Sequence, residues 1–366
     1  MELTIDRKIL KEVVSNMRSS LDHSGVKPIL KHFLFEVSNQ HLTIKATNGT
    51  IATTWTTQVD TPDDFSFTML GETLGGIVSS LDKDRVVFTY SPETDDIVLK
   101  CGKYLWEGIS GNTSSFPGIA LPENLNHIAL PTEFGSMLKK VFFSISKDVE
   151  KADLNSLCLD INKDNSGKIS LVSTDRIRLS FAHSPLNYDN DKGVRFVIPK
   201  NSVSEIIKMA PSGLFYDDEM KKIYFKTNTL TGVYVFQSIL THVEYPDIYV
   251  YLDQDFNENP VIFPKNEFIK VLKRIKLTSD KTSREGNISF TEKEAVITSL
   301  SSSHKSRETV EVSYTDNIPP EFNINLDYLL EYLSLDEEEK IEMKVIEGKC
   351  VVFDKTNYRH VLSIHN

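Results

Sequence analysis

The sequence predicts an α+β fold of three tandem domains, each a doubled strand–helix–strands motif with antiparallel sheets and two helices. One pattern occurs six times: a short apolar strand, then a proline or helix-capping residue, then a short amphipathic helix. The copies centre on positions 6, 70, 131, 199, 264 and 326, so the steps are 64, 61, 68, 65 and 62 residues. A repeat of this length sets the architecture before any shorter motif does. Pairing the copies predicts domains at residues 1–122, 127–252 and 258–366.

The composition is that of a globular protein with several cores. The chain has 366 residues, of which 40% are hydrophobic and 25% charged. It has no apolar run after a basic start and none approaching about eighteen residues, so we expect no signal peptide, no membrane span and a cytoplasmic location. Cys101, Cys158 and Cys350 are far apart and fit reduced core thiols. A net charge of −11 argues against a surface that binds nucleic acid everywhere, but allows a local basic lining.

The first domain begins with a strand at residues 3–5, after which Asp6 can cap a helix that continues to about Ser20. A second helix covers about residues 72–81, and turns at 39–40 and 48–49 separate strands. Each helix has a single apolar face and therefore needs a sheet to cover it. Residues 110–126, rich in Gly, Pro, Ser and Asn, indicate a linker. The other expected strands are 33–37, 42–46, 51–58, 65–69, 86–90, 97–101 and 104–109.

The second and third domains repeat this plan, with a boundary near residues 253–260. The expected helices are about 133–146, 200–209, 265–278 and 327–335. The expected strands are 128–130, 157–161, 168–174, 178–183, 196–198, 214–216, 222–227, 233–239, 261–263, 287–291, 295–299, 309–314, 340–346, 350–354 and 359–364.

Four of the six expected helices carry basic side chains opposite their apolar stripe. A solvated face explains one such helix, but four equivalent helices in an acidic chain favour a shared surface for phosphate groups. The sixth helix does not fit this pattern, because Glu331 and residues 336–339 are acidic. No aromatic platform for stacking bases stands out, so we expect contact with the nucleic-acid backbone, without sequence preference. The basic residues are Lys8, Lys11, Arg18, Lys139, Lys140, Lys147, Lys200, Lys208, Lys270, Lys273, Arg274 and Lys276.

No enzyme site is evident. The nine histidines have no metal-ligand spacing, and no catalytic constellation, cofactor motif or metal site is visible, so we expect a protein without catalysis, cofactor or metal. Residues 162–169 resemble the first half of a calcium loop. However, Ser173 stands where a bidentate glutamate is needed, so we expect a hairpin turn there.

Several short segments, spread over the whole length, carry a family resemblance through their order and spacing. They are Lys27-Pro28-Ile29-Leu30, Phe33-Leu34-Phe35, Ser115-Phe116-Pro117, Leu154-Asn155, residues 173–179, Val197-Ile198-Pro199-Lys200 and Glu244-Tyr245-Pro246-Asp247. In these segments the chain resembles the bacterial DNA sliding clamp, the beta subunit of DNA polymerase III. The resemblance implies the clamp fold, with sheets outside and helices inside.

The resemblance also implies a function. A head-to-tail homodimer would form a ring around duplex DNA and slide without sequence specificity. It would tether the DNA polymerase III alpha subunit and bind the clamp loader and other proteins with a clamp-binding motif. The alternative is a monomeric module of the same fold that binds partner peptides without encircling DNA, which the acidic sixth helix and an altered C-terminal tail would suit.

Site residues carry over from the family by position. The partner-peptide pocket corresponds to Leu154, Thr174, Arg176, Ile177, Arg178, Leu179, Pro246, His360, Leu362, Ser363 and Ile364. The family's usual Thr-Asp-Gly-His-Arg-Leu is Thr174-Asp-Arg-Ile-Arg-Leu179 here, and its usual Met-Pro-Met-Arg-Leu terminus is Leu362-Ser-Ile-His-Asn366. The ring interface would pair an edge strand holding Trp106 with Lys276 and Leu277. Lys27 would replace the loop arginine that the family presents to DNA.

Overall fold

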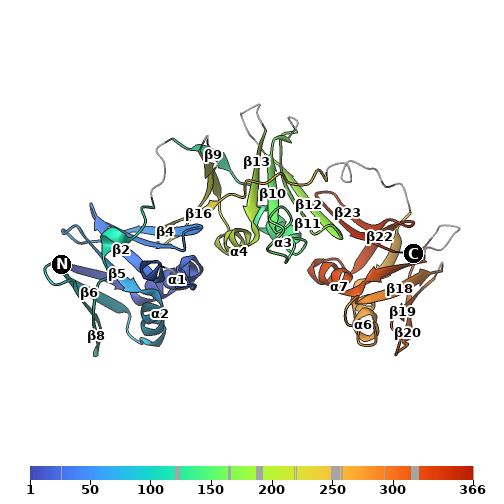
Figure 1. The fold of residues 1–366 in the computed structure, drawn as a ribbon, viewed down its shortest axis with the longest axis horizontal. Coiled ribbons are helices and arrows are strands. Elements are labelled where there is room, and N and C mark those ends of the chain that lie inside the picture. The colour runs from blue at the N-terminus through green and yellow to red at the C-terminus, as the bar shows by residue number, and fades with distance from the viewer. Residues whose placement is uncertain are drawn as a thin grey trace. The chain divides into compact units, whose positions relative to one another are not determined.

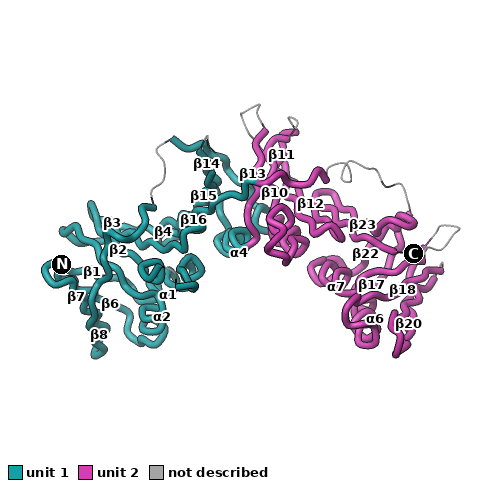
Figure 2. Tube along the Cα trace, in the orientation of Figure 1, with its two compact units in different colours: residues 1–135, 201–242 teal, residues 136–200, 243–366 magenta. Residues whose placement is uncertain are grey.

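The computed structural model confirms an α+β fold built from six strand–helix–strands motifs. It describes residues 1–25, 27–119, 124–163, 166–186, 193–217, 219, 221–248, 256, 259–291, 293–314 and 321–365. Figure 2 shows two compact units, residues 1–135 with 201–242 and residues 136–200 with 243–366. The predicted linkers at 110–126 and 253–260 and the turn at 162–169 lie partly outside the described residues.

Unit 1, residues 1–135 with 201–242, contains a four-stranded and an eight-stranded antiparallel sheet (Figure 1). The smaller sheet has the order β1 (Glu2–Asp6), β6 (Arg85–Ser91), β7 (Asp96–Cys101), β8 (Tyr104–Ile109). The larger has the order β5 (Phe65–Leu70), β2 (His32–Ser38), β3 (His41–Thr47), β4 (Ile51–Gln58), β16 (Val233–Ile239), β15 (Lys222–Asn228), β14 (Gly213–Tyr216), β9 (Asn126–Ala129). The helical segments are α1 (Arg7–Met17), α2 (Gly71–Ser80), α4 (Lys200–Met209), η1 (Arg18–Ser20), η2 (Pro28–Lys31) and η3 (Thr113–Ser115). Helix α4 belongs to this unit from Asn201 onward.

Unit 2, residues 136–200 with 243–366, repeats the arrangement with its own pair of antiparallel sheets. The larger has the order β13 (Val194–Pro199), β10 (Ser156–Ile161), β11 (Lys168–Thr174), β12 (Arg178–Pro185), β24 (Tyr358–Ser363), β23 (Cys350–Lys355), β22 (Lys340–Ile346), β17 (Val261–Pro264). The smaller has the order β20 (Arg307–Glu311), β19 (Glu294–Ser299), β18 (Glu285–Phe290), β21 (Glu321–Asn325). The helices are α3 (Phe134–Phe142), α6 (Lys265–Lys276) and α7 (Leu326–Leu335). Helix α3 belongs to this unit from Ser136 onward.

Local chemistry explains where the helices begin and end. The Asp6 side chain caps α1 as predicted, since its Oδ1 accepts from the N–H groups of Lys8 (2.7 Å) and Ile9 (3.2 Å). The apolar stripe of α1 is buried, and α1 packs beside α2 just as α6 packs beside α7. Helix α3 ends at Phe142, not near residue 146 as predicted, because the chain tightens there into i→i−3 turns. Lys147 is therefore not on a helix.

Each motif exchanges its first strand with the other motif of its domain. Strand β1 precedes α1 but joins β6, and β5 precedes α2 but joins β2. The same exchange places β9 beside β14, β13 beside β10, β17 beside β22, and β21 beside β18. This exchange of strands links the two motifs of each domain.

Both eight-stranded sheets continue across a predicted domain boundary. In unit 1, β4 pairs antiparallel with β16, with Thr54 opposite Val235. In unit 2, β12 pairs antiparallel with β24, with Arg178 opposite Leu362. Each junction is therefore a backbone ladder, which explains why the compact units cut through the second predicted domain. Among the described residues, no helix has both the length and the apolar composition needed to cross a bilayer.

A histidine lies in the core of unit 2. His360 on β24 is fully buried, and its ring stacks on Tyr332 of α7 with centroids 4.9 Å apart. Its Nδ1 shares a hydrogen bond with Ser180 Oγ (2.9 Å), while Nε2 has no hydrogen-bond partner among the described residues. Burial, assisted by the nearby Arg178 charge, lowers the pKa of His360 from 6.5 to about 3.

Acid is expected to destabilise unit 2 through this histidine. Between pH 6.5 and about 3 the unfolded chain binds a proton at His360 that the folded chain excludes. Protonation of His360 therefore has no effect on the free energy of unfolding well above pH 6.5. Below pH 6.5 it lowers that free energy increasingly, by about 2 kcal/mol at pH 5. On going from pH 7.5 to 5.0, urea titrations should show a larger loss in the free energy of unfolding for the native chain than for His360→Gln. The exposed His242→Gln should behave like the native chain, and equal losses in all three would contradict this assignment.

Candidate functional site

Seven of the eleven predicted pocket residues surround one cavity of unit 2, where β12 meets β24. The cavity measures about 560 Å³, and its floor and walls are mainly apolar. Its lining comprises Thr174, Arg176, Ile177, Arg178, Leu179, Pro246, Ile248, Phe256, Ile346, Lys349, Cys350, Val361 and Ser363.

The loop between β11 and β12 is held in one conformation by its own side chains. Thr174 Oγ1 donates to the Arg178 carbonyl (2.7 Å) and accepts from the Arg176 N–H (3.0 Å). Asp175 Oδ1 accepts from the N–H groups of Ile177 (3.1 Å) and Arg178 (3.0 Å). Arg176 has a φ of +77°, a left-handed conformation that few non-glycine residues adopt. The loop therefore presents Arg176 and Ile177 to the cavity on a fixed turn.

Arg178 is buried and connects the cavity wall to helix α7. Its Nε contacts Asp175 Oδ2 at 2.9 Å, and its Nη1 bonds to Glu331 Oε2. The guanidinium lies 4.2 Å from the centre of the Tyr328 ring and 5.3 Å from that of Phe143. Two carboxylates and two aromatic faces thus compensate a charge whose side chain is only 2% exposed. Glu331 also pairs with Lys147 at 3.8 Å, so two neighbouring cations compensate its negative charge.

Four residues expected in the pocket lie elsewhere. Side chains alternate along β24, and the face toward the cavity carries Val361 and Ser363, while His360 and Leu362 point into the core with no exposed surface. Leu154 and Ile364 are also buried and do not line the cavity. The alternation of the last strand, read from Val361, could have identified the correct face. Sequence reasoning also missed Ile248, Phe256, Ile346, Lys349, Cys350 and Val361.

Cys350 is less buried than the expectation of three core thiols implied. Cys101 and Cys158 are buried as predicted, but Cys350 is half-buried and lines the cavity. It is the first residue of β23, directly after the β22–β23 turn, where a side chain reaches the rim.

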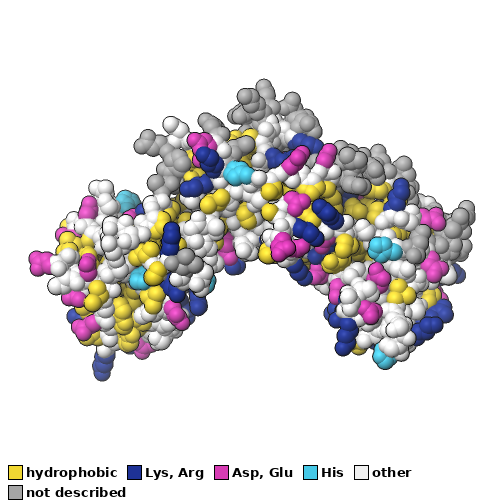
Figure 3. Space-filling view, viewed as in Figure 1, with side chains coloured by type: hydrophobic (Ala, Val, Ile, Leu, Met, Phe, Trp, Pro, Cys, Tyr) yellow, Lys and Arg dark blue, Asp and Glu magenta, His cyan; other side chains and the backbone are white. Residues whose placement is uncertain are grey.

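The predicted phosphate-binding residues differ in availability. Lys200 is a structural residue, because its Nζ donates to the carbonyls of Ile145 (2.8 Å) and Ser146 (3.1 Å), and burial lowers its pKa. Lys208 and Lys147 are exposed but paired, with Glu205 at 2.7 Å and Glu331 at 3.8 Å. Exposed side chains without an ion pair to any described residue belong to Lys8, Lys11, Arg18, Lys27, Lys140, Lys270 and Lys273. On the face drawn in Figure 3, Lys and Arg lie among Asp and Glu and form no single basic area.

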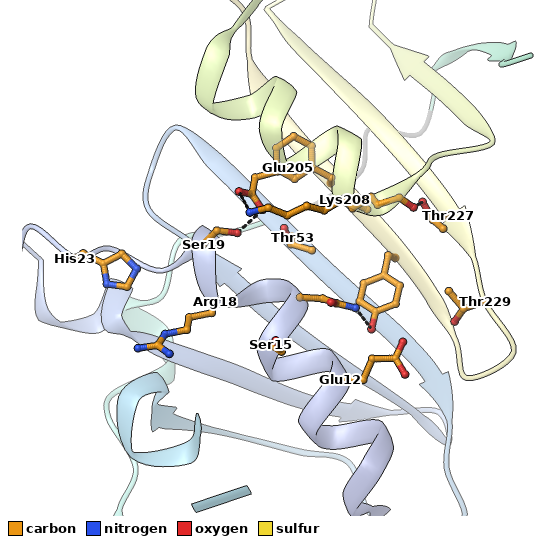
Figure 4. Close-up of a pocket in the computed structure, with 14 residues that line it drawn as sticks. Glu12, Ser15, Arg18, Ser19, His23, Thr53, Glu205, Lys208, Thr227 and Thr229 are labelled. Carbon is orange, nitrogen blue, oxygen red and sulfur yellow. Dashed lines mark hydrogen bonds and ion pairs between the residues drawn. The ribbon is translucent and has the colours of Figure 1, made fainter. Parts of the chain in front are cut away.

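A polar cleft of about 710 Å³ in unit 1 contains two of the predicted cations (Figure 4). Arg18, at the end of α1, and Lys208, on α4, line it together with His23 and Glu12. Glu205 accepts hydrogen bonds from Ser19 and from Lys208, so it joins α4 to the turn after α1. The carboxylates of Glu12 and Glu205 share the lining with these cations, so the cleft is not uniformly basic.

Among the residues proposed for the ring interface, Trp106 lies on the edge strand β8, whereas Lys276 and Leu277 lie at the end of α6, which packs against the edge strand β20. Trp106 on β8 is partly buried and packs against the core, and it covers Gly108, where an added Cβ would lie 2.3 Å from the indole. Its strand neighbour Ile109 is 72% exposed. Leu277, directly after α6, is 83% exposed, and Lys276 is paired with Asp327.

Comparison with known proteins assigns the chain to a family. Sequence models of the N-terminal, central and C-terminal domains of the DNA polymerase III beta subunit match residues 1–121, 130–247 and 255–362. The chain belongs to the DNA polymerase III beta subunit family. These bacterial sliding clamps are proteins of DNA replication.

Members of the family match over nearly their full length. The beta sliding clamp of Chlamydia pneumoniae is 22% identical over 353 residues, which cover 95% of this chain and 93% of that protein. The crystal structure of the DNA polymerase III beta subunit of Pseudomonas aeruginosa superimposes with a TM-score of 0.89 at 18% identity, covering 100% of both chains. That of Thermotoga maritima gives a TM-score of 0.86 at 20% identity and covers 100% of this chain and 99% of the other. The clamp fold implied by the resemblance is thus confirmed.

Proposed function

We propose that two copies of this chain close head to tail into a ring around duplex DNA, and that the ring tethers the replicative polymerase. One regularity of the strand pairing carries this proposal. Strand β4 ends the first motif of one domain and pairs with β16, which ends the second motif of the next domain. Strands β12 and β24 stand in the same relation one domain further along.

In both junctions, the last strand of a domain's first motif pairs with the last strand of the next domain's second motif. Two strands have no partner of this kind within the single chain. Strand β20 ends the first motif of the third domain, and β8 ends the second motif of the first domain. Both are edge strands of their sheets. Following the rule, β20 of one copy pairs with β8 of another, which makes a head-to-tail contact that repeats until the assembly closes. Two copies of three domains, at residues 1–122, 127–252 and 258–366, complete the proposed ring.

The charges suit a ring that slides. Exposed Lys and Arg side chains on α1, α3 and α6 would contact phosphates without reading bases. A ring held on DNA by its topology needs no tight ion pairs, and an acidic chain avoids trapping DNA on its exterior. In this proposal the protein acts in the cytoplasm without catalysis, is placed on DNA by a clamp loader, and holds the polymerase III alpha subunit and other partners through peptides in the pocket beside β24.

Retention on circular DNA tests the proposal. After loading by a clamp loader, the protein should remain on nicked circular duplex through gel filtration, and cutting the circle once should release it within the same assay. The chain with Ile109→Asp provides the matched control, since it keeps the basic residues and lacks the proposed edge contact. Equal loss from circular and linear DNA would favour the monomeric peptide-binding module. One reason for that alternative was the acidic sixth helix. Because Glu331 on this helix pairs with Arg178 and Lys147, that reason is weakened.

A further inference from the structure

We infer that a second, smaller pocket, on the β4–β16 junction of unit 1, binds a primary carboxamide, the neutral group of asparagine, glutamine and simple amides. This β4–β16 pocket measures about 230 Å³. Its lining comprises Thr43, Lys45, Thr54, Thr56, Ile119, Tyr224, Val235 and Gln237. The site requires neither ring closure nor peptide docking beside β24.

The surroundings of the β4–β16 pocket repeat those of the cavity beside β24. The turn at residues 47–51 is held by the same four hydrogen bonds as the turn at residues 174–178, at 2.7–3.0 Å in the first and 2.7–3.1 Å in the second. Residues 115–119 are Ser-Phe-Pro-Gly-Ile, residues 244–248 are Glu-Tyr-Pro-Asp-Ile, and the final isoleucine of each segment lines its own pocket. The two pockets therefore lie on corresponding faces of the two large sheets.

The corresponding positions differ in chemistry. Gln237 lies opposite Ala52 in the β4–β16 ladder, where Val361 lies opposite Leu179 in the β12–β24 ladder. An amide and a methyl group thus replace two branched aliphatic side chains. The repeat has kept the turn and the overlying segment in unit 1, while the lining has become polar.

Three polar side chains of this lining have no hydrogen-bond partner among the described residues. They are Thr54, Tyr224 and Gln237. Tyr224 is only 2% exposed, and burial raises the pKa of its phenol above the ordinary value, so the hydroxyl stays protonated and can donate. Tyr224 and Gln237 are cross-strand neighbours, which places the phenol beside the amide. Such groups are costly to leave unpaired, and a ligand that bonds to them recovers that cost.

The lining has no uncompensated charge. Lys45 pairs with Glu36 at 2.5 Å, and its side chain is only 17% exposed. A carboxylate or ammonium ligand would therefore lose its hydration without gaining a free opposite charge. A primary carboxamide can instead accept from Tyr224 through its oxygen and pair with the Gln237 amide as both donor and acceptor. The volume is below the roughly 300 Å³ of ordinary ligand pockets, which suits one such group on a short stem.

Methyl NMR locates the binding, because isoleucines line both pockets. Ile119 reports on the β4–β16 pocket, and Ile177 reports on the cavity beside β24. The full chain, labelled at its isoleucine methyl groups, is titrated with propionamide, propionate, propylammonium and 1-propanol, and Ile119→Val identifies the Ile119 signal. We expect propionamide to shift that signal with an affinity at least about fivefold above those of the other three probes, while the Ile177 signal stays in place.

Two conservative variants test the assigned residues. Tyr224→Phe removes only the hydroxyl, and Gln237→Val introduces the side chain found at the corresponding position of unit 2. Each should weaken propionamide binding about fivefold. Ile177→Asp changes the other cavity and is the matched control, which should leave the Ile119 response unaltered.

A capped peptide, acetyl-Ala-Gln-Ala-N-methylamide, distinguishes the sources of the carboxamide. Binding about tenfold tighter than that of propionamide would assign the pocket to a side chain of a polypeptide, and equal or weaker binding would assign it to a free small amide. An Ile119 signal that moves with neither probe would overturn the inference, and so would an equal response to propionate or 1-propanol. Unchanged affinity in both variants would overturn the roles of Tyr224 and Gln237. None of these outcomes bears on the ring, which retention on circular DNA tests.

Discussion

Replacing Ile109 or Leu277 by aspartate is expected to convert a two-chain particle of about 83 kDa (2 × 41.5 kDa) into monomers of 41.5 kDa. Both side chains are largely exposed in the single chain, at 72% and 83%, so the changes should hardly affect folding. In the proposed ring they become buried, where an unpaired carboxylate is expensive. Sedimentation at micromolar concentration measures the change directly.

The design of that experiment depends on the surroundings of each residue. Trp106 is unsuitable as the main variant, because it packs against the core of its domain and its loss would weaken folding as well as assembly. Leu230→Asp and Val149→Asp are matched controls, since these apolar side chains are 107% and 79% exposed and lie outside the proposed interface. They should leave the mass unchanged. A native chain that sediments as a monomer, or a dimer that persists in both Ile109→Asp and Leu277→Asp, would refute the ring.

Replacing Arg178 by alanine is expected to lower the free energy of unfolding of unit 2 by about 3–5 kcal/mol, because it leaves the buried partners of a charge network uncompensated. Asp175 is nearly buried, Glu331 is only partly exposed, and the faces of Tyr328 and Phe143 lose their cation. Urea titration at pH 7.5 measures the loss. The same change also removes one wall of the proposed peptide pocket.

The neighbouring arginine supplies the control. Arg176 is two residues away, exposed and without an ion pair among the described residues, so Arg176→Ala should shift the free energy of unfolding by less than about 0.5 kcal/mol. A loss below about 1 kcal/mol for Arg178→Ala would show that the network around it is not the stabilising feature described here.

Features that depend on neighbours along the chain were predictable. Apolar periodicity located the helices, Asp6 capped the first of them, and Asn39 with Gln40 adopts the positive φ values of a tight hairpin turn. These features arise from contacts a few residues apart, so a single sequence contains them. Helix ends were less accurate, as α3 illustrates, because the last turn depends on the carbonyls available where the chain leaves the helix.

The lining of the cavity agrees only in part with the residues expected in the pocket. Thr174 and residues 176–179 line the cavity, and so does Ser363 of β24, but the expected His360 and Leu362 lie on the opposite face of that strand, where Val361 was not expected to line the cavity and does. Lys200 was grouped with the DNA contacts because of its position on a helix face. Only the folded chain shows its ammonium bonded to the carbonyls of Ile145 and Ser146.

The sequence by itself determined the six-fold repeat, the helix and strand order and the family, because each of these is written in local patterns and spacing. The tertiary structure alone decided the exchange of first strands between motifs and the ladders β4–β16 and β12–β24 that continue each sheet across a domain boundary. Backbone groups make those ladders, and N–H and C=O groups are the same in every residue except proline. Which strands meet therefore depends on the packing of whole motifs, and the same holds for the pocket, whose lining comes from segments far apart in the chain.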